Sequence, residues 1–422
     1  MSQIVYIIIA ILAFGIIVII HELGHFFIAK LNGIMVEEFS LGMGPKLFGI
    51  KGKETQYNVR ILPFGGYVKM LGEESEVDSQ RSFSSKAPWR KLSVVIAGPL
   101  INIITALIIF VTISFATGVV LNSVATFNAL SPSREAGVML DDEILAVNKS
   151  KIFTYTDLEI EVQNSQGQKI LLTIKRDGAK KDIYVMPVKG YILGFNPAYD
   201  DNSKPLPKIA TLIDGYPAKE NGLLEGDVIV GVDGITISNY DEFSKYMAKN
   251  NGESVNLEIN RNGAILSFNI TPVKSDSYTI GINPKYDDHP SFIEGAKYGI
   301  NQSISLFKQI IGFFGTLFRG QAHMNEVGGP ISLIRVTSAA TEQGALPLIT
   351  IIAFINLNLG IMNLLPFPAL DGGQIVIFLY EIISRRKANQ KLVESLNYFG
   401  YMFLMALMVF MIFKDIFFPI KF

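Results

Sequence analysis

The sequence predicts a polytopic α-helical membrane protein with about four transmembrane helices, a membrane-associated β-hairpin and two α/β soluble domains inserted between the second and third helices. Of the 422 residues, 49% are hydrophobic, and the mean hydropathy of +0.34 exceeds that of a typical soluble domain. Long apolar stretches alternate with polar ones, and the longest polar stretch contains an internal repeat. These three observations favour a membrane protein with a sizeable water-soluble part.

The first apolar stretch, residues 4–30, ends in the pattern His21-Glu22-Leu23-Gly24-His25. Its first 17 residues, 4–20, carry no charge and predict a membrane helix, and the absence of a basic leader and a cleavage site argues against a removable signal peptide. Histidines four residues apart share one helix face, where both imidazoles reach one zinc ion. Glu22 is then placed to accept a proton from a water that the metal activates. Apolar residues continue after His25, which favours an embedded zinc site over polar groups at a helix end.

The composition limits the remaining ligands and the class of partner. The chain has no cysteine, which excludes disulfides, iron–sulfur clusters and thiolate zinc sites. The other histidines are His289 and His323, so a third zinc ligand is one of these or a carboxylate. His323 lies in a polar turn and is predicted to be a turn residue. A net charge of −1 gives no basic surface of the kind that binds nucleic acid.

Residues 32–91 are polar and glycine-rich and precede the second membrane helix, predicted at 92–121. Two strand-like pieces, 56–62 and 66–71, predict a hairpin that dips into the membrane or packs on it, with a small surface hairpin as the alternative. Ten Lys and Arg residues between positions 30 and 91 predict that this segment is cytoplasmic.

The second membrane helix carries Ala97-Gly98-Pro99 near its start, and these small residues predict close packing against the zinc-bearing helix. Asn102 follows one turn later. We expect it to make an interhelical hydrogen bond, and the alternative is a group that supports a metal ligand.

Residues 122–288 contain a repeat with an offset of 85, because Gly137 of Ser131–Gly137 corresponds to Gly222 (222 − 137 = 85). Each copy predicts a strand, a turn, a strand, a helix and two strands. The predicted domains are 122–200 and 201–288, closed by similar strands at 193–197 and 280–284.

The C-terminal part divides into an amphipathic helical region, 289–345, and a membrane core, 346–422, that completes the N-terminal core of 1–121. The amphipathic region is expected along the membrane surface. The membrane core holds helices predicted at 347–365 and 398–418. Between them, Pro366 and Pro368 end the first helix.

Asp371 follows that proline break and is the favoured third zinc ligand, completing a His₂Asp site. The alternative is an N-cap for the resumed helix. Basic residues at 385–391 place this loop in the cytoplasm as well, which puts the repeats outside and Asp371, His21 and His25 toward the cytoplasmic side.

The repeats resemble bacterial PDZ domains, on the pattern P-A-x-x-x-G-L-x-x-G-D-x-I-x-x-V-[DN]-G. The second copy matches from Pro217 to Gly234, whereas the first has Asp141 and Lys149 at two glycine positions. The resemblance implies that the second copy binds extended peptides by strand addition. The alternative is a spacer or steric filter that binds no peptide.

The HExxH pattern, the Asn-x-x-Pro-x-Pro-x-x-Asp-Gly pattern at 363–372 and the two PDZ-like copies together resemble the site-2 protease family of intramembrane zinc metalloproteases, close to the regulator of sigma-E protease (RseP-like) group. The resemblance implies that His21, His25 and Asp371 bind Zn²⁺ and that Glu22 is the catalytic base. The residues it implies for substrate contact are Asn358, Asn363, Pro366, Pro368, Gly65, Gly66 and Tyr67.

The resemblance also implies the setting. Substrates would be single-span membrane proteins such as anti-sigma factors already trimmed by another protease, in a stress response, with remnant signal peptides as a further class. The protein would lie in the bilayer of the bacterial cytoplasmic (inner) membrane, with the PDZ-like copies extracytoplasmic.

Two other functions fit parts of the sequence. One is a membrane-anchored PDZ scaffold with a structural metal site, against which Glu22 argues, because a structural site has no use for a base. The other is a metal transporter, against which the single cluster of ligands and the lack of a charged path through the other helices argue.

Overall fold

The computed structural model describes residues 3–73, 77–200, 205–320 and 327–418. The chain forms two compact units. One comprises 1–117 and 290–422, and the other comprises 118–289. The repeats therefore form a unit of their own, inserted in the chain between the two parts of the helical unit.

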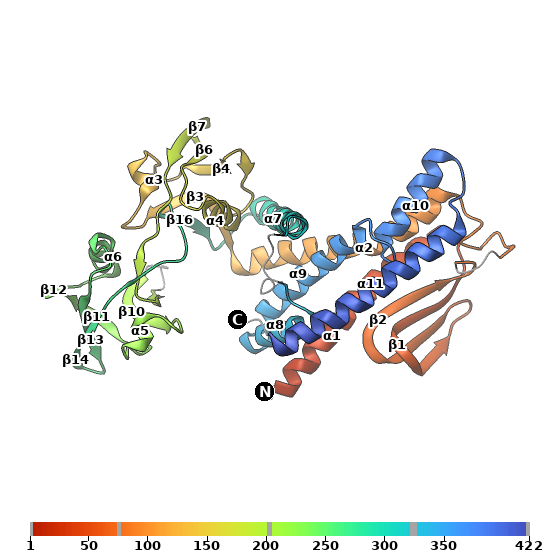
Figure 1. The fold of residues 1–422 in the computed structure, drawn as a ribbon, viewed down its shortest axis with the longest axis horizontal. Coiled ribbons are helices and arrows are strands. Elements are labelled where there is room, and N and C mark those ends of the chain that lie inside the picture. The colour runs from red at the N-terminus through yellow and green to blue at the C-terminus, as the bar shows by residue number, and fades with distance from the viewer. Residues whose placement is uncertain (1–2, 74–76, 201–204, 321–326, 419–422) are drawn as a thin grey trace. The chain divides into compact units, whose positions relative to one another are not determined.

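Four helices in the described ranges are long and apolar enough to cross a membrane: α1 (Gln3–Leu31), α2 (Pro88–Thr117), α9 (Ala345–Leu364) and α11 (Gln390–Phe417) (Figure 1). They confirm the four predicted stretches and a multi-pass membrane protein. The helix α2 continues through Pro99. It also ends earlier than predicted, because Gly118 takes a left-handed φ of 74° and Val119 begins a strand.

The described residues of the helical unit form three further helices: α7 (Phe292–Phe318), α8 (Pro330–Gln343) and α10 (Asp371–Ser384). The amphipathic helix predicted in the first part of 289–345 is α7, and it packs closely on α2, since a β-carbon on Gly299 would lie 2.7 Å from the backbone of Val111. Asp415 of α11 accepts hydrogen bonds from the backbone amides of Gly329 (3.1 Å) and Ser332 (2.8 Å), which caps the start of α8.

The strands β1 (Val36–Lys51) and β2 (Gln56–Met70) are long and bent, and each pairs with the other twice. Residues 36–41 of β1 pair with 66–70 on one side and with 56–59 on the other, and 46–51 pair with 56–60. The two pieces predicted to form a hairpin with each other therefore lie on opposite sides of residues 36–41 of β1. The sequence could not show this pairing, because the glycines of β1 interrupt the alternation of apolar and polar residues by which a strand is recognised.

This sheet packs against the C-terminal end of α1 (Figure 1). Phe39, Val68 and Met70 of the sheet form one buried cluster with Ala29 of α1 and Val94 of α2. The sheet and the two membrane helices thus share a core directly beside the histidines.

The soluble unit contains two cores of the same construction. The first contains β3 (Val119–Phe127), α3 (Pro132–Glu135), β4 (Glu143–Val147), β5 (Ser150–Lys151), α4 (Tyr155–Asn164), β6 (Ile170–Arg176) and β7 (Ala179–Val185). The second contains β10 (Pro205–Leu212), α5 (Pro217–Glu220), β11 (Val228–Val232), β12 (Ile235–Thr236), α6 (Tyr240–Lys249), β13 (Val255–Arg261) and β14 (Ala264–Ile270).

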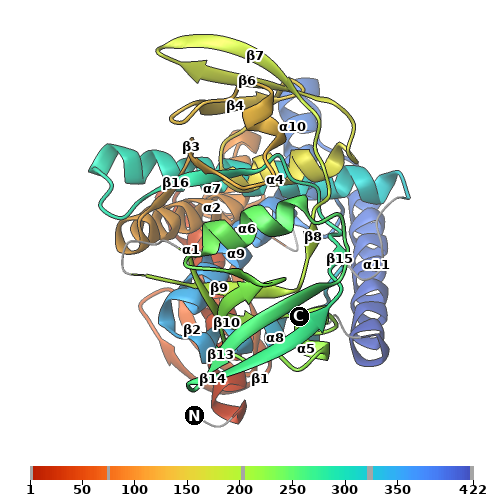
Figure 2. The same cartoon turned by 90° about the vertical axis from the view of Figure 1, so that its left-hand side faces the viewer.

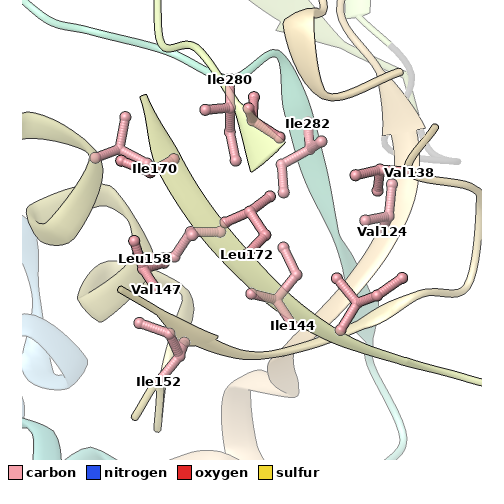
Figure 3. Packing of buried hydrophobic residues seen from close by; sticks show 13 residues of the cluster. Val124, Val138, Ile144, Val147, Ile152, Leu158, Ile170, Leu172, Ile280 and Ile282 are labelled. Carbon is pink, nitrogen blue, oxygen red and sulfur yellow. The ribbon is translucent and has the colours of Figure 1, made fainter. Parts of the chain in front are cut away.

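The two cores exchange their closing strands. The strand after the first copy, β9 (Phe195–Tyr199), pairs with β10 of the second core, and β16 (Ile282–Asp287) returns to pair with β3 of the first. Ile280 and Ile282 accordingly lie among the side chains of the first core (Figure 3). The predicted division at residue 200 places each closing strand with its own copy, which differs from this arrangement. The sequences of the two closing strands are similar, so they do not specify which sheet each strand joins.

The chain passes from one core to the other twice. The two connecting segments pair with each other through two short strands. In this pair β8 (Tyr191–Ile192) lies antiparallel to β15 (Val273–Lys274). In the second core, α6 lies beside the sheet that β9 closes (Figure 2).

The repeat also preserves a buried ion pair. Arg176 donates two hydrogen bonds of 2.7 Å to Asp142, and Arg261 donates two of 2.8 Å to Asp227. Burial opposes ionisation of both aspartates, but the arginines together with a backbone amide donor at each site hold the pKa of each carboxyl below its usual value. In each copy the ion pair joins the turn before one strand (β4 or β11) to the strand that follows the longer helix (β6 or β13).

Candidate metal centre

The structure brings His21, His25 and Asp371 together, although His25 and Asp371 are 346 positions apart in the chain (371 − 25 = 346). The Nε2 atoms of the two histidines lie 3.2 Å apart. Oδ2 of Asp371 lies 3.1 Å from Nε2 of His21 and 3.5 Å from Nε2 of His25. One turn of α1 supplies both nitrogens, and the start of α10 supplies the oxygen.

These three atoms fit a zinc ion. Bonds of about 2.0–2.1 Å in a tetrahedral site place ligand atoms about 3.3 Å from one another, which matches the three observed separations. Oδ2 of Asp371 is buried and has no hydrogen-bond partner among the described residues. A buried carboxylate oxygen without a donor is costly unless a cation satisfies it. Two imidazoles and one carboxylate are also the ligand set of catalytic zinc sites.

The loop between α9 and α10 determines where Asp371 lies. The glycines that follow it permit a tight turn, since a β-carbon on Gly372 would overlap the carbonyl of Leu365 and one on Gly373 would lie 2.6 Å from that of Phe367. Leu370 is the N-cap of α10, and Asp371 is the first helical residue. The N-cap alternative for Asp371 is therefore wrong.

The helix α2 packs against the histidines through small residues. A β-carbon on Gly24 would overlap the carbonyl of Ala97, and one on Gly98 would overlap Nε2 of His25. This confirms the predicted close packing of 97–99 on the zinc-bearing helix.

The helix α2 also supplies polar partners for both imidazoles, on the ring nitrogens that face away from the ligand cluster. Nδ1 of His25 donates to the carbonyl of Val94 at 2.9 Å, and the side chain of Asn102 lies 3.3 Å from Nδ1 of His21. A sequence cannot reveal the Val94 contact, because every residue has a carbonyl.

Glu22 lies beside one outer strand of the sheet. A β-carbon on Gly66 would lie 3.1 Å from Cγ of Glu22 and 3.5 Å from Val18 on the previous turn of α1. Gly65 precedes it with a left-handed φ of 78°. Tyr67 follows, and its hydroxyl is hydrogen-bonded to Arg60 at 2.5 Å.

An ion-pair cluster ties the last turn of α1 to the turn between β1 and β2. Lys30 and Arg81 contact the two carboxylate oxygens of Glu54 at 2.5 and 2.7 Å. The hydrogen bonds from Arg81 and then Lys30 lower the pKa of Glu54 to about 2.

The other predicted site residues are not brought to the histidines by any described hydrogen bond. Asn358 and Asn363 are half-buried on α9. Pro366 and Pro368 lie in the loop before Asp371, where a β-carbon on Gly400 of α11 would overlap the carbonyl of Pro368. Of the two remaining histidines, His289 has a side chain that is 93% exposed, and His323 lies outside the described residues.

Comparison with known proteins gives one family over nearly the whole chain. Residues 9–407 match the model of "Peptidase family M50". A protein of Clostridium acetobutylicum named "Putative zinc metalloprotease" is 36% identical over 416 residues, which is 99% of this chain and 98% of that protein. "Probable protease eep" of Enterococcus faecalis is 30% identical over 431 aligned residues, 96% of this chain and 97% of that protein.

Similarity to solved structures is partial. A PDZ domain of HtrA3 bound to a phage-derived ligand is 18% identical with a TM-score of 0.19, and the match covers 21% of this chain and 90% of that one.

Proposed function

Because this chain belongs to peptidase family M50 and is a zinc metalloendopeptidase, we propose that it cleaves the transmembrane segments of single-span membrane proteins inside the bilayer. The observation that carries this proposal is that His21, His25 and Asp371 lie together on helices of the helical unit, which contains the candidate membrane spans. A protease site at such a position reaches peptide bonds that water-soluble proteases do not.

The chemistry divides between the ion and Glu22. Zinc, when bound by His21, His25 and Asp371, lowers the pKa of a water and polarises a carbonyl. Glu22 accepts the proton of the attacking water and passes it to the nitrogen of the leaving amine, so one carboxylate serves first as base and then as acid. Bond formation at the carbonyl carbon and loss of the amine then balance without a further reagent.

The substrate must be extended where it is cut, because a membrane helix keeps its carbonyls in hydrogen bonds. Residues 66–70 form an outer strand of their sheet, and Gly66 lies against Glu22. We propose that the unwound substrate pairs with this edge beside the base. Gly65 and Tyr67 belong to the same segment, and Asn358, Asn363, Pro366 and Pro368 are the residues proposed to hold the substrate from α9 and the following loop.

The physiological setting follows from the charge pattern and the family resemblance. We propose a cytoplasmic (inner) membrane location with residues 30–91 in the cytoplasm and the repeats outside. Anti-sigma factors trimmed by another protease, and remnant signal peptides, are the proposed substrates. Transmembrane segments of this kind need a protease whose site lies within the membrane unit.

We propose that the repeats are PDZ-like and that the second core binds an extended peptide. A groove of about 570 Å³ is lined by residues 188–196, which run into β9, by α6 residues that include Phe243 and Met247, and by Asn128 and Leu130 from the segment after β3. The strand β9 ends its sheet. In the first core, Tyr155 of α4 donates to the carbonyl of Ile282 at 2.8 Å, and Gln163 makes two hydrogen bonds with the backbone of Tyr278. These bonds tie α4 to the closing segment, which leaves the second core as the receptive one.

A residue exchange tests the peptide proposal. Position 163 corresponds to Ala248, which lines the groove. Ala248→Gln should weaken binding of peptides that the wild-type chain selects from a random phage-displayed library, while Gln163→Ala should leave it unchanged. If no peptides are selected, the repeats act as a spacer or filter. If Ala248→Gln binds them equally well, the peptides do not lie in the groove beside α6.

The first experiment on the protease compares wild type with Glu22→Gln in detergent. Zinc content and cleavage of a model single-span substrate are measured on both. We expect zinc in both and cleavage by wild type alone, because Gln keeps the shape of Glu22 but cannot accept a proton. A metal-free variant would refute the assigned role.

Zinc in both and cleavage in neither would point to the scaffold alternative or to a substrate helix that does not unwind. Substrates with helix-breaking residues at the cut separate those two outcomes. Cleavage of only the weakened helices supports the protease, and cleavage of none supports the scaffold.

A further inference from the structure

Asn102 lies at the back of the metal centre. It sits on α2, is fully buried, and places Nδ2 3.3 Å from Nδ1 of His21. Its Oδ1 is buried and has no hydrogen-bond partner among the described residues. A buried amide oxygen without a donor carries the full cost of its lost hydration, so its arrangement needs an explanation.

The present contact conflicts with metal binding. If Nδ2 donates to Nδ1 of His21, the proton of the neutral imidazole must be on Nε2. Nε2 is the atom that faces Oδ2 of Asp371 and Nε2 of His25. A ring nitrogen binds a metal through its lone pair, and therefore that proton has to be on Nδ1 instead.

A half-turn of the Asn102 carboxamide removes the conflict. The turn exchanges the amide nitrogen and oxygen, so that Oδ1 accepts a hydrogen bond from Nδ1–H of His21. The oxygen that lacked a donor gains one, and Nε2 is left with its lone pair toward the other two ligands. One rotation thus gives Oδ1 a donor and frees Nε2 of His21 for the metal, while Nδ2 moves to the position that Oδ1 held.

The neighbouring histidine shows the same arrangement. The partner of Nδ1 of His25 is the carbonyl of Val94, which can only accept, so the Nδ1 of that ring carries the proton. The two acceptors, Val94 and Asn102, lie about two turns apart on α2. Their partners, His25 and His21, lie about one turn apart on α1. One helix would then hold both rings from behind through acceptor oxygens.

We infer that Asn102 is a positioning residue, whose Oδ1 fixes the tautomer of His21 so that Nε2 is free for zinc. It touches neither the substrate nor the metal and acts through His21. The inference rests on the zinc centre of the proposed function, and its tests read metal binding and protonation without a substrate, so that it can fail while the protease activity stands.

The first test is zinc affinity, measured on the full-length protein in detergent by competition with a chelator. Asn102→Leu, which removes the acceptor at similar size, should weaken affinity about 10- to 100-fold. Asn102→Asp, which keeps an acceptor oxygen, should bind at least as tightly as wild type. Asn356→Leu is the matched control, because Asn356 is a fully buried amide of α9 with no described partner, and it should bind zinc normally.

Wild-type affinity in Asn102→Leu would overturn the inference, and so would equal weakening in Asn102→Asp. The second test needs no change at Asn102, which covers the case in which Asn102→Leu does not fold. In a chain carrying His289→Gln and His323→Gln, only His21 and His25 remain. Nitrogen NMR of ¹⁵N-histidine at mildly alkaline pH should show the Nδ1–H tautomer for both rings before metal is added. An Nε2–H tautomer at His21 would refute the inference.

Discussion

Gly98 of α2 and His25 of α1 are so close that no side chain fits between them. A β-carbon on Gly98 would overlap Nε2 of His25 and lie 2.5 Å from its Cε1 and 2.9 Å from Cε1 of His21. The ligands of the candidate metal centre are therefore held partly by the absence of a methyl group on the neighbouring helix.

This contact predicts that Gly98→Ala loses zinc. The methyl group has to displace an imidazole or push α2 away from α1, and either change misplaces a ligand. We expect zinc stoichiometry well below one and loss of cleavage, measured by metal analysis and a substrate assay. Gly312→Ala in α7 is the control, since nothing lies within 4 Å of its β-carbon position, and it should bind zinc fully. Full zinc in Gly98→Ala would contradict the close approach.

Asp371→Ala should bind no stoichiometric zinc. Oδ2 of Asp371 is the one carboxylate oxygen in the described ligand cluster, and two neutral imidazoles alone hold zinc weakly. Metal analysis after dialysis measures this directly. The control is His289→Ala, because that histidine is exposed far along the chain, and the variant should keep its zinc. Stoichiometric zinc in Asp371→Ala would remove this residue from the ligand set.

The turn between β4 and β5 predicts a stabilising substitution. Asn148 and Lys149 have φ values of 48° and 72°, and their counterparts Asp233 and Gly234 have 47° and 77°. Positive φ at both residues of a two-residue loop is the signature of a type I′ turn, which favours Asn-Gly. The first copy thus keeps the backbone of the second although lysine replaces glycine.

Lys149→Gly should therefore raise the free energy of unfolding by about 1 kcal/mol, since lysine pays a steric cost at positive φ that glycine does not. The reverse exchange, Gly234→Lys, should lower it by a similar amount. Thermal unfolding of the full-length chain compares both with wild type. A less stable Lys149→Gly would show that the turn in the first copy differs from that in the second.

The Glu54 cluster predicts a stability difference that depends on pH. The pKa of Glu54 falls from 4.5 to about 2 in the folded protein, so the carboxylate stabilises the fold above about pH 4.5 and this contribution is lost as the pH falls toward 2. Glu54→Gln should accordingly lower the unfolding temperature at neutral pH and match wild type near pH 2. A difference that persists at low pH would exclude the ion pairs with Lys30 and Arg81 as its cause.

Much of the metal centre could be predicted from the sequence, and the reasons are local. His21, Glu22 and His25 are fixed by helical spacing within one turn, and a long uncharged run sets that turn in a membrane helix. Asp371 could be predicted because a proline break and two glycines surround it. Gly66 and Asn102 were recognised as candidates, but their neighbours Glu22 and His21 depend on how the helices and the sheet pack.

The sequence by itself determined the four membrane helices, the zinc-binding pattern and the repeat, because hydropathy, helical periodicity and an offset of 85 residues are properties of the chain alone. Only the tertiary structure decided that 56–59 and 66–70 flank the first part of β1, that β9 and β16 exchange cores, and that the Asn102 amide meets His21. The physical reason is the same in each case: pairing and packing partners distant in sequence are selected by long-range contacts, and the residues that make those contacts look alike until the chain has folded.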